Sequence, residues 1–106
     1  MRVLFDQGTP VPLRKYLVTH QVATTFELGW GYLKNGELLQ QSEASGFFVL
    51  VTTGQNLRYQ QNHTGRTIAI VVLTTTSWPR IERAVDLVAT AIDSAAPGSY
   101  VEVPIP

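Results

Sequence analysis

The apolar residues of this chain fall into short continuous runs that alternate with segments of helical periodicity. Runs typical of buried strands cover residues 3–5, 47–53 and 67–75, and two further strands are expected at residues 20–24 and 100–103. Helical patterns are predicted over residues 11–18, 35–45, 55–62 and 79–95. Because strands alternate with helices, the chain predicts a single α/β domain. Its sheet is expected to be central and mostly parallel, with four or five strands and right-handed crossovers.

Residues that favour helix ends support this division. Asn35 is a good N-cap for the second helix, and Gly46 is its expected C-terminal stop. Pro79 is expected to open the longest helix, which should end at residues 97–98. The apolar stripe of this helix comprises Ile81, Ala84, Val85, Val88, Ala91, Ile92 and Ala95.

The first helix and the last strand have weaker signals. The helix is expected to begin at Pro10 or Pro12, because proline is tolerated in the first turn. Its residues Leu13, Tyr16 and Leu17 then share one face. The strand that begins at Tyr100 is expected at the edge of the sheet, since prolines follow it.

Polar residues follow three of the predicted strands. In parallel sheets, ligands bind beyond the carboxyl ends of the strands, at the point where the strand order reverses. Asp6 directly follows the first strand, residues 52–56 follow the third, and residues 74–77 follow the fourth. Candidate chemistry is therefore expected at these three segments.

Composition narrows the function classes. Eight basic and eight acidic residues leave a net charge of zero, whereas strong nonspecific nucleic-acid or membrane binders usually carry a basic excess. The absence of cysteine excludes disulfides, thiolate zinc sites and cysteine nucleophiles. The first apolar run is far too short for a signal peptide or a membrane span, so a cytoplasmic protein is expected. The two histidines show no ligand spacing and are read as structural.

Two carboxylates, Asp6 and Glu37, are candidate ligands for a divalent cation. Together they would suit Mg²⁺, which could orient water and offset phosphate charge. Both also have plain structural interpretations. Glu37 lies in the first turn of a helix, where an acid stabilises the helix dipole. Asp6 can instead cap the following loop at residues 7–9 through their backbone.

The remaining candidates are neutral or basic. Gly54 and Asn56 belong to the loop after the third strand, which either lies close to a ligand or simply leads into a helix. The hydroxyl cluster at residues 74–77 either contacts phosphate or caps the helix at Pro79. Three further residues, which are basic or aromatic, either form a small RNA-contacting patch or belong to an ordinary solvated surface. These residues are Arg58, Tyr59 and Arg66.

Trp30 and Trp78 flank loops, where they either cover the core or anchor a partner. Together with the edge strand at Tyr100, exposed tryptophans would support a homodimer.

Five motifs, taken in order, resemble those of the small PIN-like proteins of the DUF5615 type. They are LFDQGTP at 4–10, HQV at 20–22, ELGW at 27–30, NGELL at 35–39 and VLVTTGQNL at 49–57. The resemblance runs from about residue 2 to residue 75. It implies a three-layer PIN-like domain and a ribonuclease that depends on Mg²⁺ or Mn²⁺. It also implies a toxin component paired with a small antitoxin protein.

The resemblance also implies a set of catalytic positions. Family acids sit at the end of the first strand, where Asp6 stands, and at the start of the second helix, where Asn35 replaces an aspartate and Glu37 remains. After the third strand, Gly54 and Asn56 stand at two further acidic positions. Because a divalent ion needs charge compensation, this depleted set predicts weak or absent metal binding.

Two functions therefore follow as expectations. One is a metal-dependent ribonuclease whose catalysis is weakened or abolished by the lost acids. The alternative is a non-catalytic PIN-like module that binds a partner protein or RNA, and the low net charge favours a protein. A phosphorylation-receiver domain shares the α/β plan, but it needs an aspartate after the third strand, where Gly54 stands.

Overall fold

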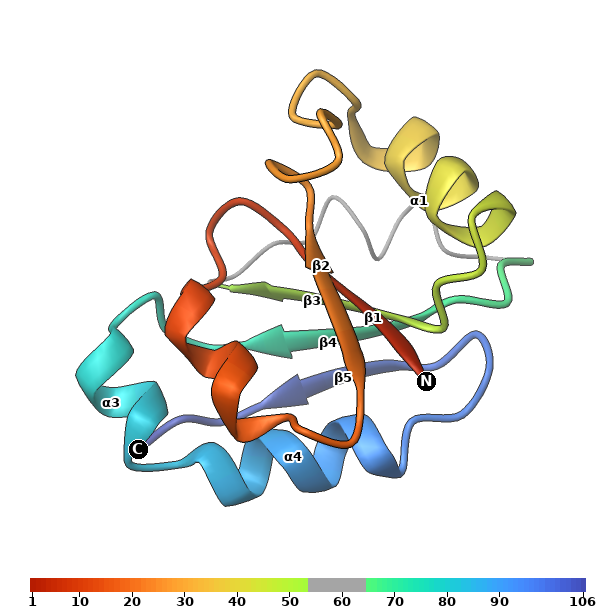
Figure 1. The fold of residues 1–106 in the computed structure, drawn as a ribbon. Helices are drawn as coiled ribbons and strands as arrows, with labels where there is room; N and C mark the ends of the chain where they lie inside the picture. The colour runs from red at the N-terminus through yellow and green to blue at the C-terminus, as the bar shows by residue number, and fades with distance from the viewer. Residues whose placement is uncertain (54–64) are drawn as a thin grey trace.

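Five parallel strands form the central sheet of the computed structural model, which describes residues 1–53 and 65–106. The strands are β1 (Arg2–Phe5), β2 (Gln21–Thr24), β3 (Val49–Thr53), β4 (Ala69–Leu73) and β5 (Tyr100–Val103). Their order in the sheet is β2-β1-β3-β4-β5 (Figure 1), and each adjacent pair is parallel. The predicted α/β class and parallel sheet are confirmed, and β5 lies at an edge as expected.

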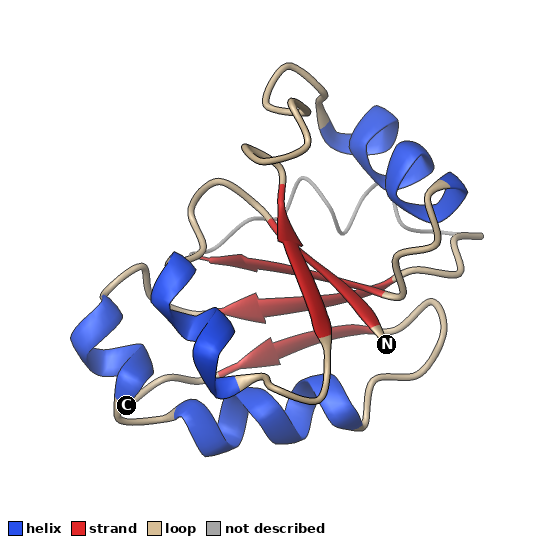
Figure 2. Ribbon diagram, viewed as in Figure 1, coloured by secondary structure: helices blue, strands red, loops and turns tan. Residues whose placement is uncertain are grey.

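Helices cover both faces of this sheet (Figure 2), which gives three layers. The described helices are the 3₁₀ helix η1 (Val11–Tyr16), α1 (Asn35–Ala44), α3 (Trp78–Glu82) and α4 (Val85–Asp93). The helix predicted at residues 55–62 lies outside the described residues.

Alternation along the strands divides the core into two clusters. In β1, Val3 and Phe5 face one side while Leu4 faces the other, as the period of two in a strand requires. The first cluster contains residues of η1, α3 and α4, among them Leu13, Ile81, Val88 and Ile92. The second contains residues of α1, among them Leu38 and Leu39. Strands buried on both faces explain why their sequences read as continuous apolar runs.

The crossovers do not all have the same hand. The β1–β2 connection through η1 and the β4–β5 connection through α4 cover the same face, but they move in opposite directions across the sheet. Parallel connections of that kind have opposite handedness. The β2–β3 connection runs over the other face and in the opposite direction to β1–β2, so these two connections have the same hand, which is right-handed (Figure 1). The β4–β5 connection is therefore left-handed. The prediction of right-handed crossovers throughout, which about 98% of such units obey, is wrong at this connection.

The longest predicted helix is in fact two helices. It breaks at residues 83–84, where the backbone N–H of Ala84 donates to Ile81 O at 2.9 Å, an i→i−3 bond. The break lets α3 bury Ile81 while α4 buries Val88 and Ile92 against the same cluster. Ser77 caps α3 by accepting from the Arg80 N–H at 3.5 Å, as the capping interpretation predicted.

The first helix also differs from its prediction. It is a 3₁₀ helix over Val11–Tyr16, and Leu13 and Leu17 are buried. Tyr16 stays 39% exposed and packs its ring against Trp78, with the centroids 6.0 Å apart. The predicted helix over residues 11–18 is therefore shorter than expected, and Tyr16 lies at the edge of its apolar face.

Helix α1 begins at Asn35, the first residue of the predicted helical pattern, and ends at Ala44, one residue before the predicted end. Its N-cap is Lys34, without a side-chain cap, and Asn35 is the first helical residue, so the predicted cap at Asn35 is wrong. At the other end, Gly46 has a φ of 84°. The Gly46 N–H donates to Glu43 O and the Phe47 N–H to Ser42 O, which is the Schellman arrangement. A left-handed residue is needed there, and glycine adopts it without a steric cost.

We expect Gly46→Ala to lower the free energy of unfolding by about 1 kcal/mol, because a Cβ disfavours the left-handed conformation. A Cβ at this site would also lie 3.1 Å from Arg2 Nη1. Urea denaturation of the purified domain measures the effect. Gly36→Ala, within the first turn of α1, is the matched control and should be neutral or stabilising. Equal effects of the two substitutions would contradict the assignment.

Candidate functional site

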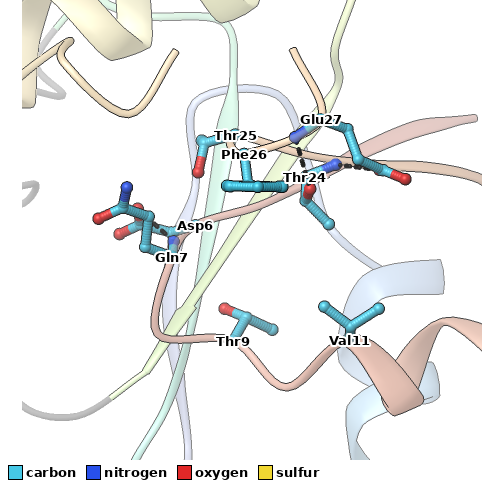
Figure 3. A pocket seen from close by; sticks show the side chains of 8 residues that line it. All are labelled: Asp6, Gln7, Thr9, Val11, Thr24, Thr25, Phe26 and Glu27. Atoms are coloured by element: carbon cyan, nitrogen blue, oxygen red, sulfur yellow. Dashed lines mark hydrogen bonds between the residues drawn. The ribbon is translucent and has the colours of Figure 1, made fainter. Parts of the chain in front are cut away.

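A pocket of about 580 Å³ opens at the carboxyl ends of β1 and β2. It is formed by the loop from β1 to η1 and by the turn that follows β2 (Figure 3). The lining residues are Asp6, Gln7, Thr9, Val11, Thr24, Thr25, Phe26 and Glu27. Asp6, which the sequence singled out, is therefore part of the pocket, and it lies where parallel sheets place their ligand sites.

Asp6 is 9% exposed and holds two parts of the chain together. Its Oδ1 accepts from the Gln7 N–H at 2.8 Å, and its Oδ2 accepts from the Thr52 hydroxyl at 3.1 Å. The first bond confirms the loop-capping interpretation. The second bond joins the end of β1 to β3. In the sheet, β1 is followed by β2 toward one edge and β3 is followed by β4 toward the other edge, so Asp6 lies at the switch point.

The loop after Asp6 closes tightly over the end of β3. The Thr9 hydroxyl donates to Val51 O at 2.9 Å, and the Thr9 N–H donates to Asp6 O at 3.0 Å. A Cβ at Gly8 would lie 2.6 Å from the Thr53 hydroxyl oxygen. A larger residue at position 8 would therefore require the Thr53 side chain to move.

The turn after β2 is fixed by a capping box. The Thr24 hydroxyl accepts from the Glu27 N–H at 3.0 Å, and Glu27 Oε1 accepts from the Thr24 N–H at 2.9 Å. Glu27 also forms an ion pair with Arg14, in which Nη1 donates to Oε2 at 3.1 Å. The hydrogen bonds from Arg14 and from the Thr24 backbone lower the pKa of Glu27 below its ordinary value. The spacing T-x-x-E is a sequence signal that would have revealed this turn.

Thr25 and Phe26 are neighbours in the pocket wall, but their side chains differ strongly in solvent exposure. Thr25 is 1% exposed, and its hydroxyl has no hydrogen-bond partner among the described residues. Its backbone is well anchored, since its N–H donates to Phe5 O and its carbonyl accepts from the Trp30 N–H. Phe26, the next residue, is 85% exposed at the rim.

The other predicted site residues do not join Asp6 in the lining of this pocket. Glu37 is exposed in the first turn of α1, as the helix-dipole interpretation expects, and it does not line the pocket. Asn35 begins the same helix. Four further candidates lie outside the described residues, namely Gly54, Asn56, Arg58 and Tyr59.

The predicted metal was Mg²⁺ or Mn²⁺, and a divalent ion of this kind needs several oxygen ligands that include carboxylates. Within residues 1–53 and 65–106, no three histidine, aspartate or glutamate side chains are grouped so that they would hold a metal ion. The described residues alone therefore do not assemble this donor set.

Arg66 joins α1 to the start of β4. Its Nη1 donates to Glu43 Oε1 at 3.1 Å, and its Nη2 donates to Gly36 O at 3.3 Å. Glu43 Oε2 also accepts from the Thr67 hydroxyl at 2.9 Å and from the Ile68 N–H at 3.2 Å. Burial raises the pKa of Glu43, but the hydrogen bonds from Thr67, Arg66 and Ile68 outweigh it and hold the pKa below 4.5. These contacts assign Arg66 a structural role.

The two tryptophans pack onto the core, as one of their predicted roles requires. Trp30 contacts Phe47 edge-on at a centroid distance of 5.9 Å, and Trp78 packs against the first cluster. His20 is structural as expected. Its Nε2 lies 2.6 Å from Asp93 Oδ1, which ties the start of β2 to the end of α4.

Comparison with known proteins identifies no relative of this chain. No family model, curated protein or solved structure matches this chain. The likeness to PIN-like proteins therefore remains an interpretation of the sequence motifs. In the described part of the chain, no helix is long and apolar enough to cross a membrane.

We expect Glu43→Gln to lower the free energy of unfolding by about 1–3 kcal/mol at pH 7, because it removes charge-assisted hydrogen bonds. The folded-state pKa of Glu43 is lowered, so its stabilisation is present above pH 4.5 and is lost as the pH falls through the folded value. The difference between wild type and variant should therefore shrink in acid. Urea titrations at several pH values measure it. A difference that is constant from pH 7 to pH 3 would contradict this role, and the exposed Glu37→Gln serves as the control.

Proposed function

We propose that this chain is a PIN-like module that binds a partner protein and retains little or no nuclease activity. The observation that carries the proposal is the loop over residues 25–34, which follows β2 and whose residues 25–27 line the pocket. Three large apolar side chains in this loop are exposed, namely Phe26 at 85%, Tyr32 at 76% and Leu28 at 38%. Exposed large apolar side chains on a loop that borders a pocket are typical of protein-binding surfaces.

Hydrogen bonds and a ring contact anchor the loop that carries these side chains. The capping box of Thr24 and Glu27 fixes its beginning, and the edge-on contact of Trp30 with Phe47 anchors its middle. Successive turns add backbone bonds, such as the Leu33 N–H to Trp30 O at 3.0 Å. A preorganised surface loses less conformational entropy on binding, which supports a recognition role for exposed residues that folding itself does not need.

The charges near the loop favour a protein over RNA. The charged residues that line the pocket are Asp6 and Glu27, both of them acidic. Glu27 is paired with Arg14, so an RNA backbone in the pocket would bring its phosphates against the Asp6 carboxylate, whereas nucleic-acid sites carry lysine and arginine. The net charge of zero points the same way. A small antitoxin-like protein, as the family resemblance implies, is the partner that we propose.

A metal-dependent ribonuclease is the second candidate, and the position of Asp6 favours it. Asp6 is a buried carboxylate at the switch point of a parallel sheet, where the family resemblance expects the first metal ligand. The sequence after β3 argues for lost activity, because Gly54 and Asn56 supply no carboxylate there. Mg²⁺ or Mn²⁺ would then bind weakly or not at all.

We expect Phe26→Ser to weaken binding of the protein encoded by the neighbouring gene about thirtyfold, as removal of an aromatic anchor does. Calorimetry with the two purified proteins measures the affinity. Val18→Ser is the matched control, because Val18 is 84% exposed but does not line the pocket. Both variants should unfold like wild type. The same affinity for Phe26→Ser and wild type, or the absence of any complex, would contradict the proposal.

We expect the wild-type chain to leave RNA intact in the presence of Mg²⁺ or Mn²⁺, since it lacks the acids after β3. Incubation with a mixed RNA pool and gel analysis measures this. Cleavage by Gly54→Asp that disappears in Gly54→Asp combined with Asp6→Asn would reveal a nuclease scaffold that lost its activity. Cleavage by the wild-type chain that requires Asp6 would replace the main proposal with the second candidate.

A further inference from the structure

We infer that the pocket between β1 and β2 binds a small, neutral, flat aromatic molecule. The volume of about 580 Å³ lies within the range of small-molecule sites, about 300–1,000 Å³. Most of the lining surface that a ligand would contact belongs to carbon atoms. The inference goes beyond the binding of a partner protein and does not depend on it.

The hydroxyl groups of the described lining contribute little to ligand binding, because the chain itself uses or covers them. The Thr9 hydroxyl donates to Val51 O at 2.9 Å, and the Thr24 hydroxyl accepts from the Glu27 N–H at 3.0 Å. The Thr25 hydroxyl oxygen is buried and exposes almost no surface to the pocket. The lining therefore favours a ligand that depends on few hydrogen bonds.

The two carboxylates of the described lining are also held by the chain. Glu27 forms an ion pair with Arg14. Asp6 is buried and accepts from the Gln7 N–H and from the Thr52 hydroxyl. A charged ligand loses its hydration in a pocket and regains little from groups that are already paired. A neutral ligand avoids this cost.

Phe26 and Val11 shape the pocket for a flat ring. Figure 3 shows the Phe26 ring edge-on, with one face turned to the side on which Thr9 and Val11 lie. Phe26 and Val11 are both exposed, so both offer apolar surface to a molecule that enters between them. Aromatic rings attract one another beyond the gain from buried area, and a saturated ring lacks this contribution. The expected ligand is therefore aromatic and not merely apolar.

The fold itself does not require the exposed ring of Phe26. The capping box of Thr24 and Glu27 fixes the turn, and the Thr25 N–H donates to Phe5 O. A polar side chain at position 26 would leave all of these bonds in place and would be better hydrated. An aromatic ring at the rim of a largely apolar pocket therefore supports the binding of a ligand.

The test uses 2-naphthol as the probe and decahydro-2-naphthol as its saturated counterpart, with the full chain labelled with ¹⁵N. Amide chemical shifts of the lining residues should move and saturate with 2-naphthol. The saturated alcohol should bind about fivefold more weakly, because it lacks the aromatic contact. The anion 2-naphthoate and the cation 2-naphthylmethylammonium should each bind at least tenfold more weakly, because their charge loses hydration.

Two variants separate the contributions of the pocket walls. Phe26→Leu keeps an apolar side chain but removes the ring, so it should bring the affinities for 2-naphthol and its saturated counterpart close to equality. Val11→Ser should weaken 2-naphthol about fivefold, because it removes apolar surface from the contact. Val18→Ser is the matched control, since Val18 is exposed but does not line the pocket, and it should bind like wild type.

The absence of saturable binding would overturn the inference, as would equal affinities of the wild-type chain for the two alcohols. Tighter binding of either charged compound, or equal effects of Val11→Ser and Val18→Ser, would also overturn it. No partner protein is present, so failure of this experiment does not bear on the proposed partner binding. Val11 lies outside the loop over residues 25–34, so Val11→Ser should lose affinity for 2-naphthol and keep its affinity for the partner.

Discussion

The hydrogen bond from the Thr52 hydroxyl to Asp6 joins β1 and β3 at the point where the sheet reverses its order. The same carboxylate caps the loop that leads to η1, so one buried charge fixes both the sheet and the pocket floor. A buried carboxylate is costly unless it is hydrogen-bonded, and these donors offset that cost. The Thr9 hydroxyl, which donates to Val51 O, adds a second attachment of this loop to β3.

The loop after β2, which contributes to the pocket wall, is well anchored but carries exposed apolar side chains. A capping box and the edge-on contact of Trp30 hold the loop over residues 25–34, yet Phe26 and Tyr32 point their apolar surface to solvent. Thr25 keeps a buried hydroxyl without a partner among the described residues. Local choices that disfavour folding are expected at functional sites, and here they occur in neighbouring residues of one pocket.

The sequence predicted the elements well because the strands are buried on both faces and read as continuous runs. It identified Asp6 and the stop at Gly46, whose chemistry is local. It missed the break in the long helix and the left-handed β4–β5 connection, because both depend on how α3 and α4 pack against η1. It also missed Thr25 and Phe26, since burial of one and exposure of the other are set by the fold and not by residue type.

The most direct test of the account is a double-mutant cycle of Asp6→Ala and Thr52→Val, followed by urea denaturation. If the Asp6 carboxylate holds the switch point together, the two substitutions should be coupled by about 1–3 kcal/mol, because each removes the same charge-assisted hydrogen bond. Substitutions whose effects add to within about 0.5 kcal/mol would contradict this role, since independent sites behave in that way. Asp6 would then contribute to the domain through some other contact.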